Sequence, residues 1–176
     1  MKLRARRSDN PEVKELLGEL AGRVHSLAQV QSRILAAGDL ERVDFAAYMA
    51  DAAVALHRMH GNGHISLRVH LEAELALTVQ RAGPLALLVY EIILNSFKHA
   101  FPNAERGEVS VAIDATGEQP ILIIEDNGVG FSPDTPGMGT TLINELAIEA
   151  DVEVVTLDRK SGGTRVEVRF KPELTR

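Results

Sequence analysis

The feature that most constrains the fold is a change in the spacing of apolar residues along the chain. Between residues 13 and 60, apolar side chains recur every three or four positions, which predicts amphipathic helices. From residue 64 onward, short stretches that alternate between apolar and polar residues predict half-buried strands, with further helices between them. The chain is therefore expected to be an α+β protein, with two helices followed by a β-β-α-β-β-α-β-β section.

The first helix is expected over residues 13–37, where Pro11 suits the first turn and Gly38 is placed to end it. Its apolar stripe is longer than a lone helix can bury, so it predicts a partner helix in this chain or in a second copy. A second helix should run from about Asp44 to His60. The later elements are expected as strands over 64–72, 75–80, 108–115, 120–127, 151–158 and 163–171, and as helices over 84–101 and 140–150.

Composition excludes several classes of protein. The 176 residues contain no Cys, which excludes disulfides and thiolate metal sites. A net charge of −6 argues against a general nucleic-acid binder, which needs a basic surface. The apolar runs are too short and interrupted to span a bilayer, and the basic start lacks the apolar region of a signal peptide. These features predict a soluble, cytoplasmic chain.

The stretch EIILNSFKHAF, residues 91–101, places polar side chains in an otherwise apolar helix. Because positions i, i+4 and i+7 or i+8 share a helical face, Glu91, Asn95, Lys98 and His99 should project together. Carboxylate and amide oxygens suit Mg²⁺, and Lys supplies a point charge for phosphate, so this face is typical of a metal–phosphate site. The alternative is the solvated edge of an ordinary amphipathic helix.

The stretch IIEDNGVGF, residues 123–131, ends a strand in Asp126 and follows it with Gly128 and Gly130. A calcium loop needs oxygen ligands where these glycines stand, and a P-loop needs a Lys after them. A dinucleotide fingerprint fails because the next helix is delayed by residues 132–134. The remaining interpretations are a strand-end carboxylate that accepts a hydrogen bond from a nucleobase amino group, or an ordinary Asn-Gly turn.

Two further glycine-rich stretches are weaker indications. GMGTT, residues 137–141, opens a helix, and backbone N–H groups at a helix start form an anion site. SGGT, residues 161–164, on its own indicates no more than a hairpin turn.

Taken in order, these stretches resemble the nucleotide-binding boxes of the ATPase and kinase superfamily that includes gyrase, the Hsp90 chaperones, histidine kinases and MutL. EIILNSFKHAF resembles the N box, DNGVGF the first glycine box, GMGTTLI the second, and GGT the Gly-Thr on the last strand. Glu with KHAF in the N box, and a short lid over residues 131–136, are similar to two-component sensor histidine kinases of the HWE or HisKA_2-like type. The resemblance covers about residues 8–173 and implies a Bergerat-type ATP-binding fold, a two-layer α/β sandwich, after a helical hairpin remnant.

The resemblance also implies roles for residues on the phosphate side. Asn95 would coordinate Mg²⁺, Lys98 would contact phosphate, and His99 would flank the nucleotide. Glu91 would be a candidate base or an outer group of the metal site. Gly137, Gly139 and Thr140 would line the phosphates.

On the base side, the resemblance implies that Asp126 binds the adenine amino group. Gly128 and Gly130 would shape the base pocket, and Thr164 would support the adenine-side network. The implied reaction is transfer of the ATP γ-phosphoryl group to a histidine and then to the receiver domain of a response regulator. The implied organisation is a partial dimerisation and phosphotransfer region over 1–42, an ATP-binding domain over 43–176, and a homodimer without nucleic-acid or membrane contact.

The chain departs from the family pattern in two places. The family's acceptor-histidine stretch is missing, and His25 is the nearest substitute, although a packing or surface role is the plainer interpretation for it. The helix ending ELAIEAD also lacks the Gly usual before the next strand. The other histidines, His57, His60, His64 and His70, hint at a metal cluster, but "GNG" breaks the helix between them.

Two other functions remain open at this point. The chain could be a non-catalytic, dimeric docking module of a phosphorelay that has lost ATP binding, but Asn95 and Asp126 are both present. It could also be a serine kinase of the anti-sigma type, although such proteins lack the long N-terminal helix pair expected here.

Overall fold

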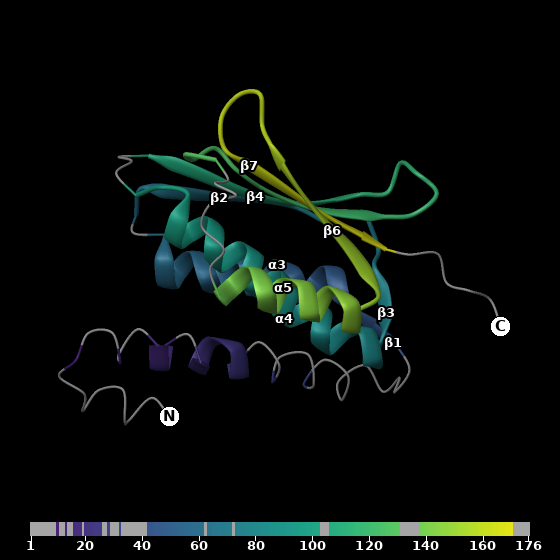
Figure 1. Cartoon of the computed structure of the whole chain (residues 1–176). Helices are drawn as coiled ribbons and strands as arrows, with labels where there is room; N and C mark the ends of the chain where they lie inside the picture. The colour runs from purple at the N-terminus through teal and green to yellow at the C-terminus, as the bar shows by residue number, and fades with distance from the viewer. Residues whose placement is uncertain are drawn as a thin grey trace.

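The computed structural model describes residues 42–61, 63–71, 73–102, 106–130 and 138–170, together with residues 10, 13, 16–18, 20–25, 28 and 32. A mixed sheet forms one layer, and three helices, α3, α4 and α5, cover one of its faces (Figure 1). The N-terminal helical residues lie on the side of these helices that faces away from the sheet. The expected α+β architecture, with helices before a two-layer α/β sandwich, is confirmed.

From residue 42 onward, a single strand or a pair of consecutive strands stands between successive helices and at both ends. They are β1 (Arg42–Asp44), α3 (Phe45–His60), β2 (Ile65–His70), β3 (Ala76–Thr78), α4 (Val79–His99), β4 (Gly107–Asp114), β5 (Ile121–Asp126), α5 (Met138–Glu149), β6 (Val152–Asp158) and β7 (Thr164–Phe170).

The main sheet has five strands in the order β2-β4-β5-β7-β6. The two expected hairpins, β4–β5 and β6–β7, are antiparallel, whereas β2 pairs with β4 in parallel. Parallel neighbours need a crossover connection, and α4 provides it here. The expected strands 64–72 and 75–80 therefore do not pair with each other: β3 instead pairs with β1, a strand that the sequence pattern did not predict.

Helix α3 begins where the sequence predicted. The Asp44 carboxylate accepts a hydrogen bond from the Ala47 N–H at 3.1 Å and so caps one of the free donors of the first turn. The buried face of α3 includes Tyr48, Met49 and Leu56, which join the core between helices and sheet. One short polar side chain thus fixes the point where β1 turns into a helix.

Helix α4 begins at Val79, so the expected start at Pro84 is wrong. Pro84 lies in the sixth helical position and removes one backbone donor there. The turn before it is held by tertiary contacts, because Arg81 donates to the carbonyl oxygens of Ala150 and Asp151, both at 3.0 Å. Contacts from the end of α5 therefore extend α4 beyond the point that local sequence signals indicate.

The turn between α5 and β6 shows how the chain manages without the usual glycine. Asp151 has a φ of 54°, the left-handed conformation that commonly ends a helix and that Gly most often occupies. Asp tolerates this conformation better than most side chains. The departure from the family pattern is thus accommodated within a single turn.

The outer face of the sheet carries charged side chains in register. Arg165 donates to Glu125 and to Glu167, each at 2.7 Å, and Arg169 donates to Glu167 at 2.7 Å. Hydrogen bonds from Arg165 and Arg169 hold the pKa of Glu167 below its ordinary value of 4.5. Loss of hydration is the largest influence on Arg165 and lowers its pKa, but the hydrogen bonds to the two glutamates raise it overall.

The described residues 13, 16–18, 20–25, 28 and 32 are helical, as the apolar spacing predicted for this part of the chain. Leu16 and Val24 are 52% and 57% exposed, so these members of the apolar stripe face solvent in the single chain. Self-association through the stripe remains a prediction, as does the boundary between residues 42 and 43. The expected end at Gly38 lies outside the described residues. Among the helices of the described parts, none is long and apolar enough to cross a membrane.

Candidate functional site

Asp126 ends β5 as a carboxylate that is only 4% exposed. Its Oδ1 atom accepts hydrogen bonds from the backbone N–H groups of Gly128 at 3.0 Å and Thr164 at 3.1 Å. The Ser96 hydroxyl of α4 donates to Oδ2 at 3.4 Å. All three donors are neutral, so the carboxylate is oriented without being paired to a cation through these bonds.

The chain around Asp126 is fixed by contacts from two directions. Asn127 bonds twice to Glu108 of β4, through its N–H at 3.2 Å and its side-chain oxygen at 2.8 Å. Arg159, from the β6–β7 hairpin, donates to the Asp126 carbonyl oxygen at 2.9 Å. Asn127 therefore joins the end of β5 to β4, while the carboxylate of Asp126 beside it is reached by the Ser96 hydroxyl of α4.

Two glycines are required by the close approach of chain segments at this point. A Cβ on Gly128 would overlap the carbonyl oxygen of Ala100, the same atom that accepts a hydrogen bond from the Val129 N–H at 2.9 Å. Gly163 has a φ of +92°, and a Cβ there would overlap the Asp126 carbonyl oxygen. Gly128 thus allows the loop after β5 to pack against the end of α4, and Gly163 allows the β6–β7 hairpin to pack against the end of β5.

The polar residues of α4 occupy distinct environments. Asn95 and Lys98 are half-buried and His99 is exposed, near the end of the helix that contacts Asp126 through Ser96. Glu91, one turn earlier, is only 2% exposed. Glu91 is therefore not part of a solvated helix edge, and its partner is Arg23 of the N-terminal helical residues.

The remaining predicted site residues follow the elements that carry them. Thr164 begins β7, and its N–H reaches Asp126. Gly139 and Thr140 belong to the first turn of α5. Gly130 has a φ of +88° and lies opposite the β6–β7 hairpin. Gly137 and the lid residues 131–136 lie outside the described residues.

Sequence reasoning missed Ser96 and Arg159. Ser96 lies between Asn95 and Phe97 on α4, and helical spacing alone gives it no role, although a buried hydroxyl requires a hydrogen-bond partner. Arg159 lies in a hairpin turn, where a basic residue is unremarkable. A signal for Ser96 existed, since it immediately follows the predicted metal ligand Asn95.

The histidines do not assemble into a metal site in the described part of the chain, where no group of three or more metal-binding side chains occurs. His57 contacts the Ile65 carbonyl oxygen at 2.7 Å through Nε2 and packs on Phe97 with ring centroids 5.9 Å apart. It is a structural histidine that ties α3 to β2. His25 is exposed on the N-terminal helical residues.

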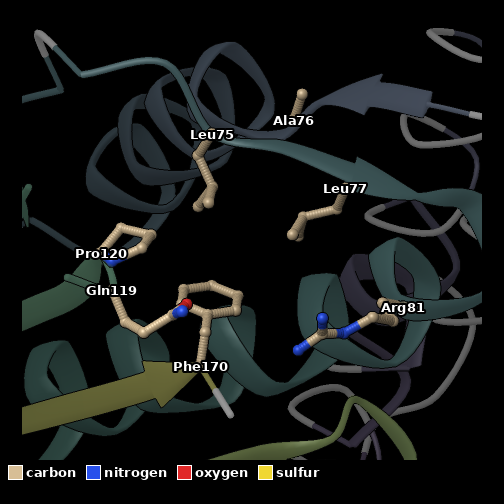
Figure 2. Close-up of a pocket in the computed structure, with 7 residues that line it drawn as sticks. All are labelled: Leu75, Ala76, Leu77, Arg81, Gln119, Pro120 and Phe170. Carbon is tan, nitrogen blue, oxygen red and sulfur yellow. The ribbon is translucent and has the colours of Figure 1, made fainter. Parts of the chain in front are cut away.

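A separate pocket lies at the opposite ends of the same elements. It has a volume of about 200 Å³ and is lined by Leu75, Ala76, Leu77, Arg81, Gln119, Pro120 and Phe170 (Figure 2). Arg81 stands at the start of α4 and Phe170 at the end of β7, whereas Ser96 and Thr164 stand at the other ends. This pocket therefore shares no residue with the group around Asp126.

Comparison with known proteins gives two family matches. Residues 80–174 match the family described as histidine kinase-, DNA gyrase B-, and HSP90-like ATPase. Residues 1–60 match a histidine kinase family. The two matches together extend over most of the chain.

Individual relatives agree with these families. The chain is 27% identical over 159 residues to blue-light-activated histidine kinase 2 of Erythrobacter litoralis, which is 85% of this chain and 45% of that protein. It is 28% identical over 177 residues to the sensor histidine kinase PdtaS of Mycolicibacterium smegmatis, which is 96% of this chain and 35% of that protein. The chain thus spans less than half the length of these relatives.

Solved structures share the fold. The histidine kinase domain of a blue-light activated histidine kinase from Erythrobacter litoralis superposes with a TM-score of 0.79 at 24% identity, covering 94% of this chain and 90% of that chain. The cytoplasmic segment of the histidine kinase QseC gives a TM-score of 0.60 at 17% identity, covering 86% and 95%. The family match over residues 80–174 shows that the chain belongs to the histidine kinase-, DNA gyrase B- and HSP90-like ATPase family, and these structures show that it shares the fold of histidine kinase domains.

Proposed function

We propose that this chain binds Mg-ATP between α4 and the end of β5 and supports transfer of the γ-phosphoryl group to a histidine, and from there to a response regulator. The observation that carries the proposal is Asp126, a buried carboxylate held by neutral donors beside the N-box helix. Burial of a charge requires compensation, and a ligand that donates to the carboxylate supplies more of it.

The arrangement of Asp126 supports selection of adenine. Oδ1 already accepts two backbone hydrogen bonds, so Oδ2 has the greater remaining capacity to accept. An ionised carboxylate is only an acceptor, which suits the 6-amino group of adenine and disfavours a 6-oxo group. Asp126 is thus proposed as the residue that recognises the base.

The phosphate side is proposed to be formed by α4 and the start of α5. The amide oxygen of Asn95 fits Mg²⁺ in type, and its half-buried position leaves it accessible to a ligand. Bound Mg²⁺ would neutralise charge on the triphosphate. Lys98 and His99 extend the same end of α4, and Gly139 and Thr140 place backbone N–H groups of α5 where an anion is favoured.

The proposed catalysis depends on positioning and charge neutralisation more than on covalent work by the chain. Glu91 is a candidate base only in a conformation where Arg23 has left it, since a base must be within reach of the proton that it takes. The acceptor is proposed to be a histidine other than His25, so this chain alone should bind nucleotide and show little autophosphorylation. The proposed partners are a receiver domain and a second copy of the chain.

Calorimetry with ADP tests the proposal through the metal. With Mg²⁺ present, Asn95→Ala should lower ADP affinity about tenfold or more, because a metal ligand is lost. In excess EDTA the two proteins should bind ADP with similar affinity, which serves as the internal control. Equal affinities with Mg²⁺ would show that Asn95 does not hold the metal. Failure of the wild-type chain to bind ADP would favour a docking module without nucleotide.

A further inference from the structure

Glu91, the one acidic side chain of α4, is paired with an arginine from a segment that is distant in sequence. Arg23 donates from Nε and Nη2 to the two carboxylate oxygens of Glu91, the second contact at 2.9 Å. The Glu91 side chain is 3% exposed and that of Arg23 is 29% exposed. The pair joins the N-terminal helical residues to α4 across 68 positions of sequence.

A second contact lies beside the ion pair. Gly22 approaches Tyr90 so closely that an added Cβ would overlap the Tyr90 hydroxyl oxygen. Tyr90 is 5% exposed, so it has little room to move aside. By contrast, a Cβ on Gly18, one turn away on the same helical residues, would meet no atom within 4 Å. Positions 22 and 23 are therefore a local point of docking.

The energetics of burial make this contact consequential. A buried carboxylate that loses the cation paired with it is strongly destabilised unless it regains water. Fork-shaped pairing by Arg fixes geometry as well as charge. The exposed pair between Arg68 and Glu108, at 2.8 Å with side chains 64% and 32% exposed, has neither property. Separation of the helical residues from α4 is the simplest way for Glu91 to regain hydration.

We propose that Arg23 and Glu91 form a latch that docks the N-terminal helical residues on α4 and, while closed, withholds the N-box carboxylate from solvent and substrate. In the closed state both oxygens of Glu91 accept from Arg23 and the side chain is only 3% exposed, so a substrate proton does not come within reach of the carboxylate. Opening the latch exposes Glu91 one turn from Asn95. The docking of the N-terminal helical residues on α4 does not depend on the proposed nucleotide function. The role of Glu91 as a base, which the docking prevents, does rest on that function.

Hydrogen–deuterium exchange of the nucleotide-free chain tests the latch. The amides of residues 20–25 should be protected in the wild type, and Arg23→Gln should speed their exchange at least tenfold. Glu91→Gln should have a similar effect, and the double variant should exchange no faster than either single variant, because all remove one interaction. Arg23→Lys should fall between, since it keeps the charge and loses the fork.

Matched variants separate the latch from general effects. Gly22→Ala should also speed exchange of residues 20–25 about tenfold, whereas Gly18→Ala, which raises helix propensity equally, should leave it unchanged or slower. Arg68→Gln should change nothing in residues 20–25. Measurement at two protein concentrations reveals any protection from self-association, and slow exchange of β4 and β5 amides verifies that each variant is folded.

Unchanged exchange in both Arg23→Gln and Gly22→Ala would overturn the latch, as would equal effects of Gly18→Ala and Gly22→Ala. Wild-type residues 20–25 that exchange at unprotected rates would overturn it as well. ADP calorimetry on the same samples reports on the nucleotide proposal separately. If the chain binds no ADP but the variants speed exchange of residues 20–25 as expected, the latch stands and the nucleotide proposal fails. If the chain binds ADP but the variants leave exchange unchanged, the nucleotide proposal stands and the latch fails.

Discussion

Two carboxylates of this protein are almost equally buried and are compensated in opposite ways. Asp126, 4% exposed, receives hydrogen bonds from two backbone N–H groups and a serine hydroxyl. Glu91, 2% exposed, is paired with the guanidinium group of Arg23. The first keeps its negative charge available to a ligand, while the second has its charge neutralised within the chain.

This difference teaches that burial alone does not identify a binding residue. Neutral donors orient a carboxylate and leave it in electrostatic need of a further donor, which is what a ligand site requires. A bidentate cation satisfies the carboxylate and joins two segments instead. By this criterion Asp126 is prepared for a ligand and Glu91 for docking, although both belong to the proposed nucleotide site.

The largest expected effect is on ADP affinity, when Asp126, the carboxylate held by neutral donors, is replaced. Asp126→Asn keeps the size of the side chain and removes its charge, and it can turn an amide N–H₂ toward the adenine amino group. We expect ADP affinity to fall about a hundredfold, or about 3 kcal/mol. Calorimetry measures this, with Asp114→Asn at the far end of the β4–β5 hairpin as the control. A loss of less than threefold would place Asp126 outside the base site.

A smaller effect is expected for Ser96, which supports Asp126 through one hydroxyl at 3.4 Å. Ser96→Ala should weaken ADP binding about three- to tenfold, since one neutral hydrogen bond contributes roughly 0.5–1.5 kcal/mol. Ser110→Ala on β4 is the matched control and should bind ADP as the wild type does. An effect of Ser96→Ala as large as that of Asp126→Asn would mean that the hydroxyl contacts the ligand itself.

The smallest effect concerns Glu167, a third carboxylate with little exposure, which is held by two arginines. Its folded-state pKa lies below the ordinary value of 4.5, so its ionised form stabilises the fold at higher pH. That contribution is complete above pH 4.5 and is lost as the pH falls through the folded-state pKa. Urea unfolding should show that Glu167→Gln flattens this acid-side loss by about 1 kcal/mol or less. A steeper loss in the variant would contradict the assignment.

Local signals in the sequence predicted what depends on local chemistry. Helix α3 begins next to Asp44 as expected, and Asp126 ends a strand as expected, because helical periodicity and strand alternation involve neighbouring residues. The expected start of α4 at Pro84 is wrong, since a local pattern carries no information on the contacts of Arg81 with the two residues that follow α5. The pairing of β2 with β4 likewise depends on how α4 crosses the sheet.

The candidate site could likewise be predicted only where it depends on the spacing of residues within one segment. The spacing of Glu91 and Asn95 indicated a shared helical face, but it did not indicate that Arg23, 68 positions away, covers one end of that face. Gly163 read as a hairpin residue, yet its lack of a Cβ is required by the carbonyl oxygen of Asp126. Close approaches between distant segments set both features, and periodicity along one segment carries no information about them.

The most direct test of the central claim, that Asp126 accepts from the amino group of adenine, compares ADP with inosine diphosphate, which carries a 6-oxo group. Calorimetry on the wild-type chain should show ADP binding at least about thirtyfold more tightly, a difference of about 2 kcal/mol. Asp126→Asn should abolish this preference. Equal binding of the two nucleotides by the wild-type chain would contradict the account.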